Sequence, residues 1–335
     1  MKIVQFIASK GWGGAEDSFI ELCNALAKEI DIDVLLFKEN LIEDKLDKKI
    51  IIHRLTSSSS RHNPFLYLEL KQLLQKINPD IIHTHSAKAS EIIYYLSKLI
   101  PLRQVATKRN PRKARIFNKI KYVVAISQNV AQSISNTNPT IIYNGLLKNT
   151  QNHIIRKTDD TIFTIVAIGR LDKIKGFDKL IDQVSKLELP YKLELIGDGI
   201  ELDNLRQLAK QKGISKKIDF LGYREDIPSI ISNSDLIVIS SLSEGFGRVV
   251  IESLFYGKLL ISTKVGISTE ILPKSLLVEH NQIADKIKEI YKNQPKYIQL
   301  FESVKKEYLK KFSIQEKVQE YKNYYESILQ RDKIK

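Results

Sequence analysis

Short apolar runs alternate with helical stretches along nearly the whole chain, and this rhythm most constrains its fold. Strands interleaved with helices indicate a parallel sheet covered on both faces. The rhythm breaks once and restarts, so we expect an α/β protein with two Rossmann-like, doubly wound parallel-sheet domains that bind ligand at the carboxyl ends of their strands. The expected strands lie at residues 2–8, 32–37, 50–53, 81–84, 105–107, 122–126 and 141–142, and then at 161–168, 193–196, 218–221, 236–239 and 259–262.

The break between the two series is a polar, weakly periodic stretch at residues 148–160, which is typical of a linker. A chain of 335 residues is long enough for two separate cores. We therefore expect a first domain at residues 1–152 and a second at 153–312, facing each other across a cleft. Residues 313–335 follow as a C-terminal helical segment.

Composition limits the compartment and the class of partner. Cys23 is the one cysteine, so no internal disulfide can form and a reducing cytoplasm is the expected location. No apolar run reaches the length of a membrane span, and the apolar start of the chain is too short for a signal peptide. The formal charge of +14 favours anionic partners, but no finger, RNP-like or helix-turn-helix signature points to nucleic acid.

Positive charge is concentrated in one stretch without any acidic residue, residues 103–121. We expect this basic stretch to hold the first domain against an anionic membrane surface and to present the acceptor side of the cleft. The alternative is an ordinary solvated face. The residues expected to face the acceptor or the membrane are Lys108, Arg109, Arg112, Lys113 and Arg115.

Two glutamates, Glu244 and Glu252, flank the start of an expected helix in the segment S-E-G-F-G-R-V-V-I-E-S-L-F-Y-G. The order strand, loop, helix aims backbone N–H groups at an anion. Glu252 lies roughly 6–7 Å along the helix axis, about the span of a diphosphate. Carboxylates accept hydrogen bonds from hydroxyls, so the pattern predicts a nucleotide-sugar, with Glu244 at the sugar and Glu252 at the ribose. The diphosphate would lie against Gly245, Phe246, Gly247, Arg248 and Val249.

A second cluster, A-I-G-R-L-D-K-I-K-G, follows the first strand of the second domain and places Arg170 and Lys175 near the expected site. A diphosphate leaving group gains negative charge as its bond to the sugar breaks. Fixed cations beside it stabilise that transition state more than the ground state. The glycines of L-I-G-D-G, among them Gly197, would let a loop pass tightly at a strand end.

These segments resemble the E-x7-E motif and the G-R-L…K-G pair of retaining glycosyltransferases of the GT-B fold, family 4 (glycosyl transferases group 1). The resemblance is strongest over residues 161–270. It implies transfer with retention from a nucleoside diphosphate sugar, UDP-sugars being preferred, to a glycan or lipid-linked acceptor. It also implies neither metal nor cofactor, bacterial lipopolysaccharide or surface polysaccharide synthesis, a location on the inner face of the cell membrane, and a terminal helix that crosses back to the first domain.

The same resemblance extends to three further segments. Tyr223 and Arg224 match the turn that binds the nucleobase, and Gly13 and Gly14 match a loop that offers N–H groups to phosphate or to the transferred sugar. The run D-I-I-H-T-H matches an H-x-H whose histidine contacts the sugar, and we favour His85 over His83. Strand alternation sends both rings to the same side. Without the resemblance, a purely structural pair or a metal site lacking its third ligand would be the alternatives.

Two departures separate this chain from the family pattern. The usual glycine pair is reduced to Gly266-Ile267, and residues 272–274 replace the glycine loop that normally follows. Both changes touch the donor-sugar side, so the resemblance does not identify the sugar. The rival interpretations are a sugar-nucleotide epimerase on the same fold, whose acid and base groups nothing marks, and a non-catalytic partner subunit, against which the intact cations and glutamates argue.

Overall fold

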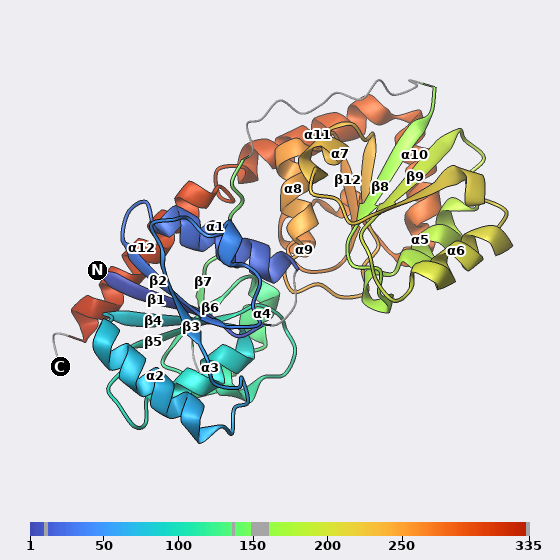
Figure 1. Ribbon diagram of the computed structural model, residues 1–335. Coiled ribbons are helices and arrows are strands. Elements are labelled where there is room, and N and C mark those ends of the chain that lie inside the picture. The colour runs from blue at the N-terminus through green and yellow to red at the C-terminus, as the bar shows by residue number, and fades with distance from the viewer. Residues whose placement is uncertain (10–12, 136–137, 149–160, 333–335) are drawn as a thin grey trace. The chain divides into compact units, whose positions relative to one another are not determined.

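The computed structural model describes residues 1–9, 13–135, 138–148 and 161–332 (Figure 1). The chain divides into two compact units, Met1–Leu147 with Lys311–Lys335, and Lys148–Lys310. The chain therefore passes between the units twice. The expected boundary between residues 152 and 153 lies outside the described residues.

The described residues of the first unit form a seven-stranded sheet in the order β3-β2-β1-β4-β5-β6-β7. All neighbouring strands pair in parallel, which explains their nearly continuous apolar character. The order reverses direction between β1 and β4, where Ile7 is paired with His85. The strands are β1 (Lys2–Ile7), β2 (Asp31–Phe37), β3 (Ile51–Leu55), β4 (Ile81–His85), β5 (Gln104–Lys108), β6 (Tyr122–Ala125) and β7 (Thr140–Ile141).

Helices cover both faces of this sheet (Figure 1). On one face pack α1 (Gly14–Leu26) and α12 (Ile314–Arg331), which share an apolar core with β1, β2 and β4. On the other face pack α2 (Pro64–Ile77) and α3 (Ser86–Leu96). Shorter elements complete the unit, namely η1 (Glu43–Lys45), η2 (Arg115–Asn118) and α4 (Gln128–Gln132).

The C-terminal helix belongs to the first unit, although it follows the second in sequence. In α12, Tyr321, Tyr325 and Ile328 are buried in the core that α1 also covers. The two crossing segments meet where Leu146 bridges Ser313, and the Leu146 amide donates to the Phe312 carbonyl at 2.9 Å. Burial of the face that carries these tyrosines thus holds α12 against the first unit.

The described residues of the second unit form a six-stranded parallel sheet in the order β10-β9-β8-β11-β12-β13. Its direction reverses between β8 and β11. The strands are β8 (Phe163–Ile168), β9 (Tyr191–Ile196), β10 (Ile218–Gly222), β11 (Leu236–Ile239), β12 (Leu260–Thr263) and β13 (Leu277–Val278). The two-residue strand β13 has no counterpart among the expected strands, since an apolar pair carries no periodicity.

The helices of the second unit fall into two groups. One group contains α5 (Phe177–Val184), α6 (Leu202–Gln211) and α10 (Ile283–Lys292), and the other α7 (Ile227–Ser232), α8 (Arg248–Tyr256) and α11 (Gln294–Tyr308). Short turns lie between them, at η3 (Lys173–Lys175), η4 (Ser215–Lys217), α9 (Ser268–Ile271), η5 (Lys274–Leu276) and η6 (His280–Gln282). None of the helices in the described part of the chain is both long and apolar enough to cross a membrane.

The predicted fold class is confirmed, because both units are doubly wound parallel sheets. Element limits differ by a few residues. Helix α3 begins at Ser86, directly after the last residue of β4. Ser86 has a positive φ of 71° directly after β4, so the chain turns from strand to helix within one residue.

Candidate functional site

The strand order of the second unit reverses between β8 and β11. In open α/β sheets, ligands bind at such a reversal, at the carboxyl ends of the strands. Two loops meet there, one after β8 and one after β11. The Leu242 amide donates to the Ile174 carbonyl at 2.7 Å, and the Ser240 hydroxyl donates to the Lys175 carbonyl at 2.9 Å. Gly176 fits this contact because a Cβ there would lie 2.2 Å from the Ser240 carbonyl oxygen. The two loops are therefore fixed against each other.

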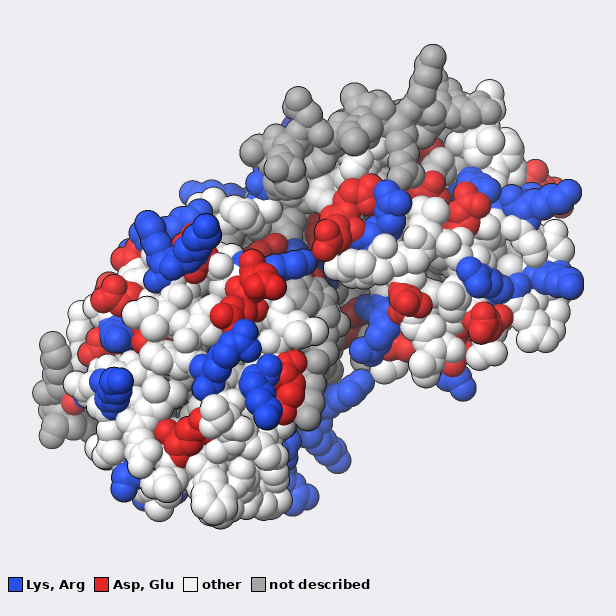
Figure 2. Space-filling view, in the orientation of Figure 1, with Lys and Arg blue, Asp and Glu red and all other residues white. Residues whose placement is uncertain are grey.

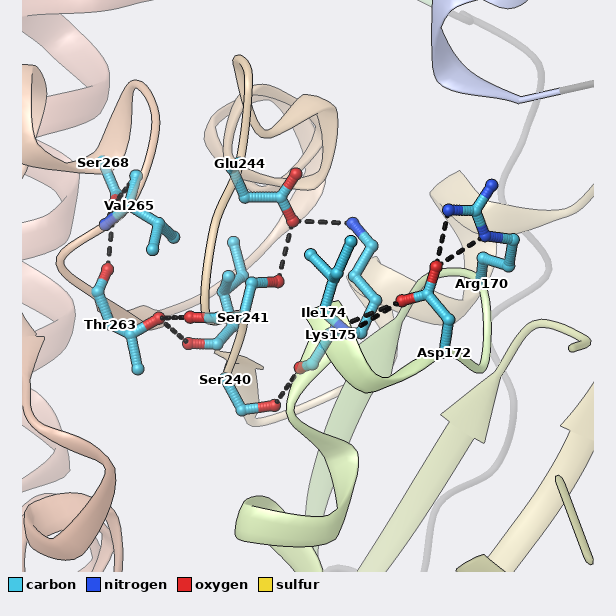
Figure 3. A network of polar contacts seen from close by, with 11 residues as sticks. Arg170, Asp172, Ile174, Lys175, Ser240, Ser241, Glu244, Thr263, Val265 and Ser268 are labelled. Carbon is cyan, nitrogen blue, oxygen red and sulfur yellow. Dashed lines mark hydrogen bonds and ion pairs between the residues drawn. The ribbon is translucent and has the colours of Figure 1, made fainter. Parts of the chain in front are cut away.

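Lys175 and Glu244, one from each loop, form an ion pair at this edge. The Lys175 Nζ lies 2.6 Å from Glu244 Oε1, and the same oxygen accepts a hydrogen bond from the Ser241 hydroxyl at 2.7 Å. Figure 3 shows the two charged side chains pointing toward one another. Their side chains keep 23% and 15% of their exposure, so both remain accessible to a ligand.

Arg170 lies on the other side of the loop that follows β8 (Figure 3). Its guanidinium contacts one oxygen of Asp172 through Nε at 2.7 Å and through Nη2 at 2.5 Å. The other oxygen of Asp172 caps η3 by accepting from the amides of Ile174 and Lys175. Sequence reasoning missed Asp172, although an Asp before a short helical turn is an N-cap signal. The Arg170 side chain itself is 72% exposed.

Glu252 occupies the second turn of α8, one helical turn beyond Arg248. The Arg248 Nε donates to Glu252 Oε1 at 2.9 Å, an i,i+4 contact in which both side chains are mostly buried. The helix begins after Gly247, whose φ of 93° suits glycine. The predicted placement is confirmed here, since Glu244 lies in the loop before α8 and Glu252 inside the helix.

The loop that carries Glu244 rests on a second loop after β12, which the sequence analysis treated only as a departure from the family pattern. The Ile267 amide donates to the Phe246 carbonyl at 2.7 Å. Gly266 allows this approach, because its φ is 50° and a Cβ would lie 2.4 Å from that carbonyl oxygen. Thr263 also donates to the Ser241 carbonyl at 2.7 Å, so the support comes from the end of β12.

The other residues of the second unit that are predicted to bind the nucleotide-sugar lie at the ends of β9 and β10. A Cβ on Gly197, whose φ is 132°, would lie 1.9 Å from the Gly169 carbonyl oxygen, so this glycine lets two strand-end loops touch. Tyr223 is 61% exposed at the end of β10. Arg224 makes a two-point contact with Asp226, at 2.7 Å for each pair of atoms.

In the first unit the corresponding reversal lies between β1 and β4, and His85 ends β4. The residue is fully buried, with 0% accessibility, and its expected contact with the sugar stays a prediction. Its Nδ1 accepts from Arg109 at 2.8 Å, and its Nε2 lies 2.7 Å from Gln5 Oε1. Burial holds its pKa well below the usual range. The ring lies 4.2 Å from that of His83, so the two point to the same side as predicted.

The basic stretch is divided by the fold. Lys108 and Arg109 are 2% and 8% exposed, so they cannot face a membrane, and this part of the prediction is wrong. The cause is that Lys108 ends strand β5, where its Nζ donates to the Ser133 hydroxyl at 2.7 Å. Asp332 pairs with Arg103 at 3.4 Å and with Lys121 at 2.9 Å. Besides Arg103 and Lys121, the stretch keeps four exposed cations, Arg112, Lys113, Arg115 and Lys119.

Gly13 and Gly14 lie where α1 begins. Gly13 is extended and precedes the helix, and its carbonyl accepts from the Glu16 amide at 2.9 Å. The expected Gly-rich loop also includes residues 11 and 12, which lie outside the described residues. Within the described ranges no group of three or more His, Cys, Asp or Glu side chains could hold a metal ion.

Comparisons with known proteins cover most of the chain. The Glycosyltransferase Family 4 model matches residues 12–146, and the Glycosyl transferases group 1 model matches residues 148–307. The lipopolysaccharide core biosynthesis glycosyltransferase LpsE of Rhizobium meliloti is 27% identical over 273 residues, 79% of each chain. A Campylobacter jejuni N-acetylgalactosaminyltransferase, named for a diphospho-undecaprenol substrate, is 25% identical over 289 residues, 76% of this chain and 78% of the other.

The fold comparison agrees. The crystal structure of Anabaena HepE in complex with UDP-glucose has a TM-score of 0.85 and 22% identity, over 98% of this chain and 100% of the other. Two parallel-sheet units of this kind are those of the GT-B fold. The two family models cover nearly the whole chain between them, and the relatives are glycosyltransferases. The chain therefore belongs to the glycosyl transferases of group 1.

Proposed function

We propose that this glycosyltransferase moves a sugar, with retention and without a metal ion, from a nucleoside diphosphate to a glycan or lipid-linked acceptor. One observation carries the proposal. Lys175 and Glu244 meet at the strand-order reversal of the second unit, directly before the helix that holds Glu252. A cation, a hydroxyl-binding carboxylate and a helix N-terminus are thereby brought to one edge of the sheet.

Donor binding would exchange the partners of these groups. Lys175 and Arg170 each contact a carboxylate in the structure, so a diphosphate can take the place of those carboxylates. Glu244 would then accept hydrogen bonds from sugar hydroxyls, and Glu252 from the ribose. Partly exposed ion pairs contribute about 0–1 kcal/mol, which makes such an exchange inexpensive.

The same cations would promote bond cleavage. Negative charge grows on the diphosphate as the sugar departs, and preorganised cations stabilise that charge most in the transition state. Lys175 and Arg170 would thus supply what other transferases obtain from a divalent ion. Retention follows if the acceptor attacks from the face that the diphosphate leaves, with a phosphate oxygen taking the acceptor proton.

Donor and acceptor classes come from the relatives. HepE was crystallised with UDP-glucose, and we infer a UDP-sugar here. LpsE acts in lipopolysaccharide core synthesis, and the Campylobacter enzyme is named for an undecaprenol-linked substrate. We infer a role in lipopolysaccharide or surface polysaccharide assembly, at the inner face of the cell membrane.

The test is a panel of nucleotide-sugars, with release of nucleoside diphosphate measured in EDTA with and without acceptor lipid extracts. The expected result is acceptor-dependent release of UDP from one UDP-sugar. The anomeric configuration of the transferred sugar should be the same in the product as in the donor. Activity that EDTA abolishes and Mn²⁺ restores would contradict the metal-free scheme. Release that never depends on acceptor would contradict transfer.

A further inference from the structure

A surface pocket of about 290 Å³ lies in the first unit, and its lining includes none of the glutamates and cations of the second. It runs along α3, between the residues before α2 and the segment that joins β5 to β6. Short apolar side chains form part of its wall. Its polar lining comprises Arg61, Glu91, Tyr95, Lys113, Arg115 and Lys119.

The charges around this pocket do not cancel. Arg61 and Glu91 form an ion pair at 2.6 Å and neutralise each other. The side chains of Lys113, Arg115 and Lys119 have no ion pair or hydrogen bond within the described part of the chain. Over much of the face in Figure 2, by contrast, Lys and Arg lie beside Asp and Glu. The pocket therefore carries three uncompensated positive charges.

The fold explains why these cations converge. Lys113, Arg115 and Lys119 surround the short helix η2, which packs against α3. Within η2, the side chains of Ile116 and Phe117 are buried, so they anchor this segment. Alternating buried apolar and exposed basic residues thus fix the cations along the pocket rather than on a loose loop.

The chemistry favours a phosphate group over other anions. A phosphate offers several acceptor oxygens for the three cations. The nearby carboxylate of Glu91 is already engaged by Arg61 and does not neutralise them. Tyr95, which is 46% exposed, adds a ring face and a hydroxyl beside the cations. We propose that this pocket binds the phosphate or diphosphate group carried by the acceptor, an inference that rests on the proposed glycosyl transfer.

The test uses the whole chain and inorganic pyrophosphate as the probe, at fixed ionic strength. The background is Arg170→Ala with Lys175→Ala, which removes the donor cations. In that background we compare Lys113→Gln with Arg115→Gln and Lys119→Gln, and a matched variant, Lys28→Gln with Lys48→Gln and Lys49→Gln. The matched variant removes the same charge from exposed positions of the same unit. Calorimetry should show pyrophosphate affinity lowered about tenfold or more by the pocket variant and about twofold or less by the matched one.

Three outcomes would overturn the inference. The first is unchanged pyrophosphate affinity in the pocket variant, and the second an equal loss in the matched variant. The third is loss of binding to phosphatidylglycerol-containing vesicles, but not of pyrophosphate binding, which would make the cations a membrane contact. Titration of UDP into the pocket variant made without the Arg170 and Lys175 substitutions should match the wild type, and failure of UDP to bind the wild-type chain would count against the proposed function alone.

Discussion

The two strand-order reversals of the molecule are built from different chemistry. At β1 and β4 the polar side chains of Gln5, His83 and His85 are fully buried and bonded to one another through protein partners. At β8 and β11 the polar groups are ion pairs that keep part of their exposure, as for Lys175 and Glu244. One scaffold thus carries a buried polar network in the first unit and partly exposed ion pairs in the second.

The buried polar network has one self-consistent pattern of donors. Arg109 can only donate, so His85 Nδ1 accepts and the neutral ring donates through Nε2 to Gln5 Oε1. Gln5 Nε2 donates to the Tyr325 hydroxyl, which donates to His83 Nδ1. The remaining His83 N–H donates to the Thr107 hydroxyl. Arg109 is the exception, because its Nε and Nη1 are buried and have no hydrogen-bond partner within the described residues.

The largest expected effect concerns Lys175. Lys175→Ala should lower kcat about 10²–10³-fold, because a preorganised cation beside the leaving diphosphate is lost. Lys179→Ala is the matched control, since Lys179 is exposed and, among the described residues, pairs only with its neighbour Asp178. Steady-state turnover of both variants decides it. Equal turnover in the two variants would mean that the Lys175–Glu244 pair is a structural contact like those of the first unit.

The two glutamates should separate binding from turnover. Glu252→Ala should weaken UDP binding about 10–100-fold, because charged hydrogen bonds to the ribose contribute about 1.5–3 kcal/mol. Glu244→Ala should leave UDP affinity nearly unchanged and lower kcat, since its proposed partner is the sugar. Calorimetry with UDP and turnover with the UDP-sugar measure the two effects. Unchanged UDP affinity in Glu252→Ala would remove the ribose assignment.

Sequence patterns predicted most of the fold, and the position of Glu244 in a loop and of Glu252 in the helix that follows, since the strand runs and the glutamate spacing are local features. They failed where a contact between distant segments decides the outcome. Lys108 reads as a surface cation, yet β5 carries it inside to Ser133. His85 is buried because Gln5 and Arg109, about eighty and twenty-four residues away, enclose it. The support of Glu244 by Gly266 and Thr263 is likewise a contact between loops.

Acidification should destabilise the first unit through its histidines. Burial lowers the pKa of His83 to about 3 and that of His85 well below the usual range. The unfolded chain therefore binds more protons once the pH falls below about 6.5, and each buried histidine costs about 1.4 kcal/mol of stability at pH 5.5. Urea unfolding followed by circular dichroism at pH 7.5 and 5.5 measures this loss.

Two variants test the assignment to buried histidines. His83→Gln should roughly halve the loss of stability between pH 7.5 and 5.5, whatever its effect at pH 7.5. His62→Gln should leave the loss as in the wild type, because His62 is exposed. A wild-type stability that does not change between the two pH values would show that the buried network accepts protons in the folded state.

The smallest expected effect is seen when Arg170 of the second unit is compared with Lys108 of the first. Arg170→Ala should change the free energy of unfolding by less than about 0.5 kcal/mol, because a 72% exposed side chain paired with Asp172 adds little stability. Lys108→Met should cost about 1–3 kcal/mol, because it removes the two hydrogen bonds that the buried Lys108 donates to Ser133. Their order should reverse for turnover, where Arg170→Ala is the more damaging change. If urea unfolding shows Arg170→Ala to be as destabilising as Lys108→Met, the charges of the second unit are fixed structural contacts, and an incoming diphosphate could not exchange them cheaply.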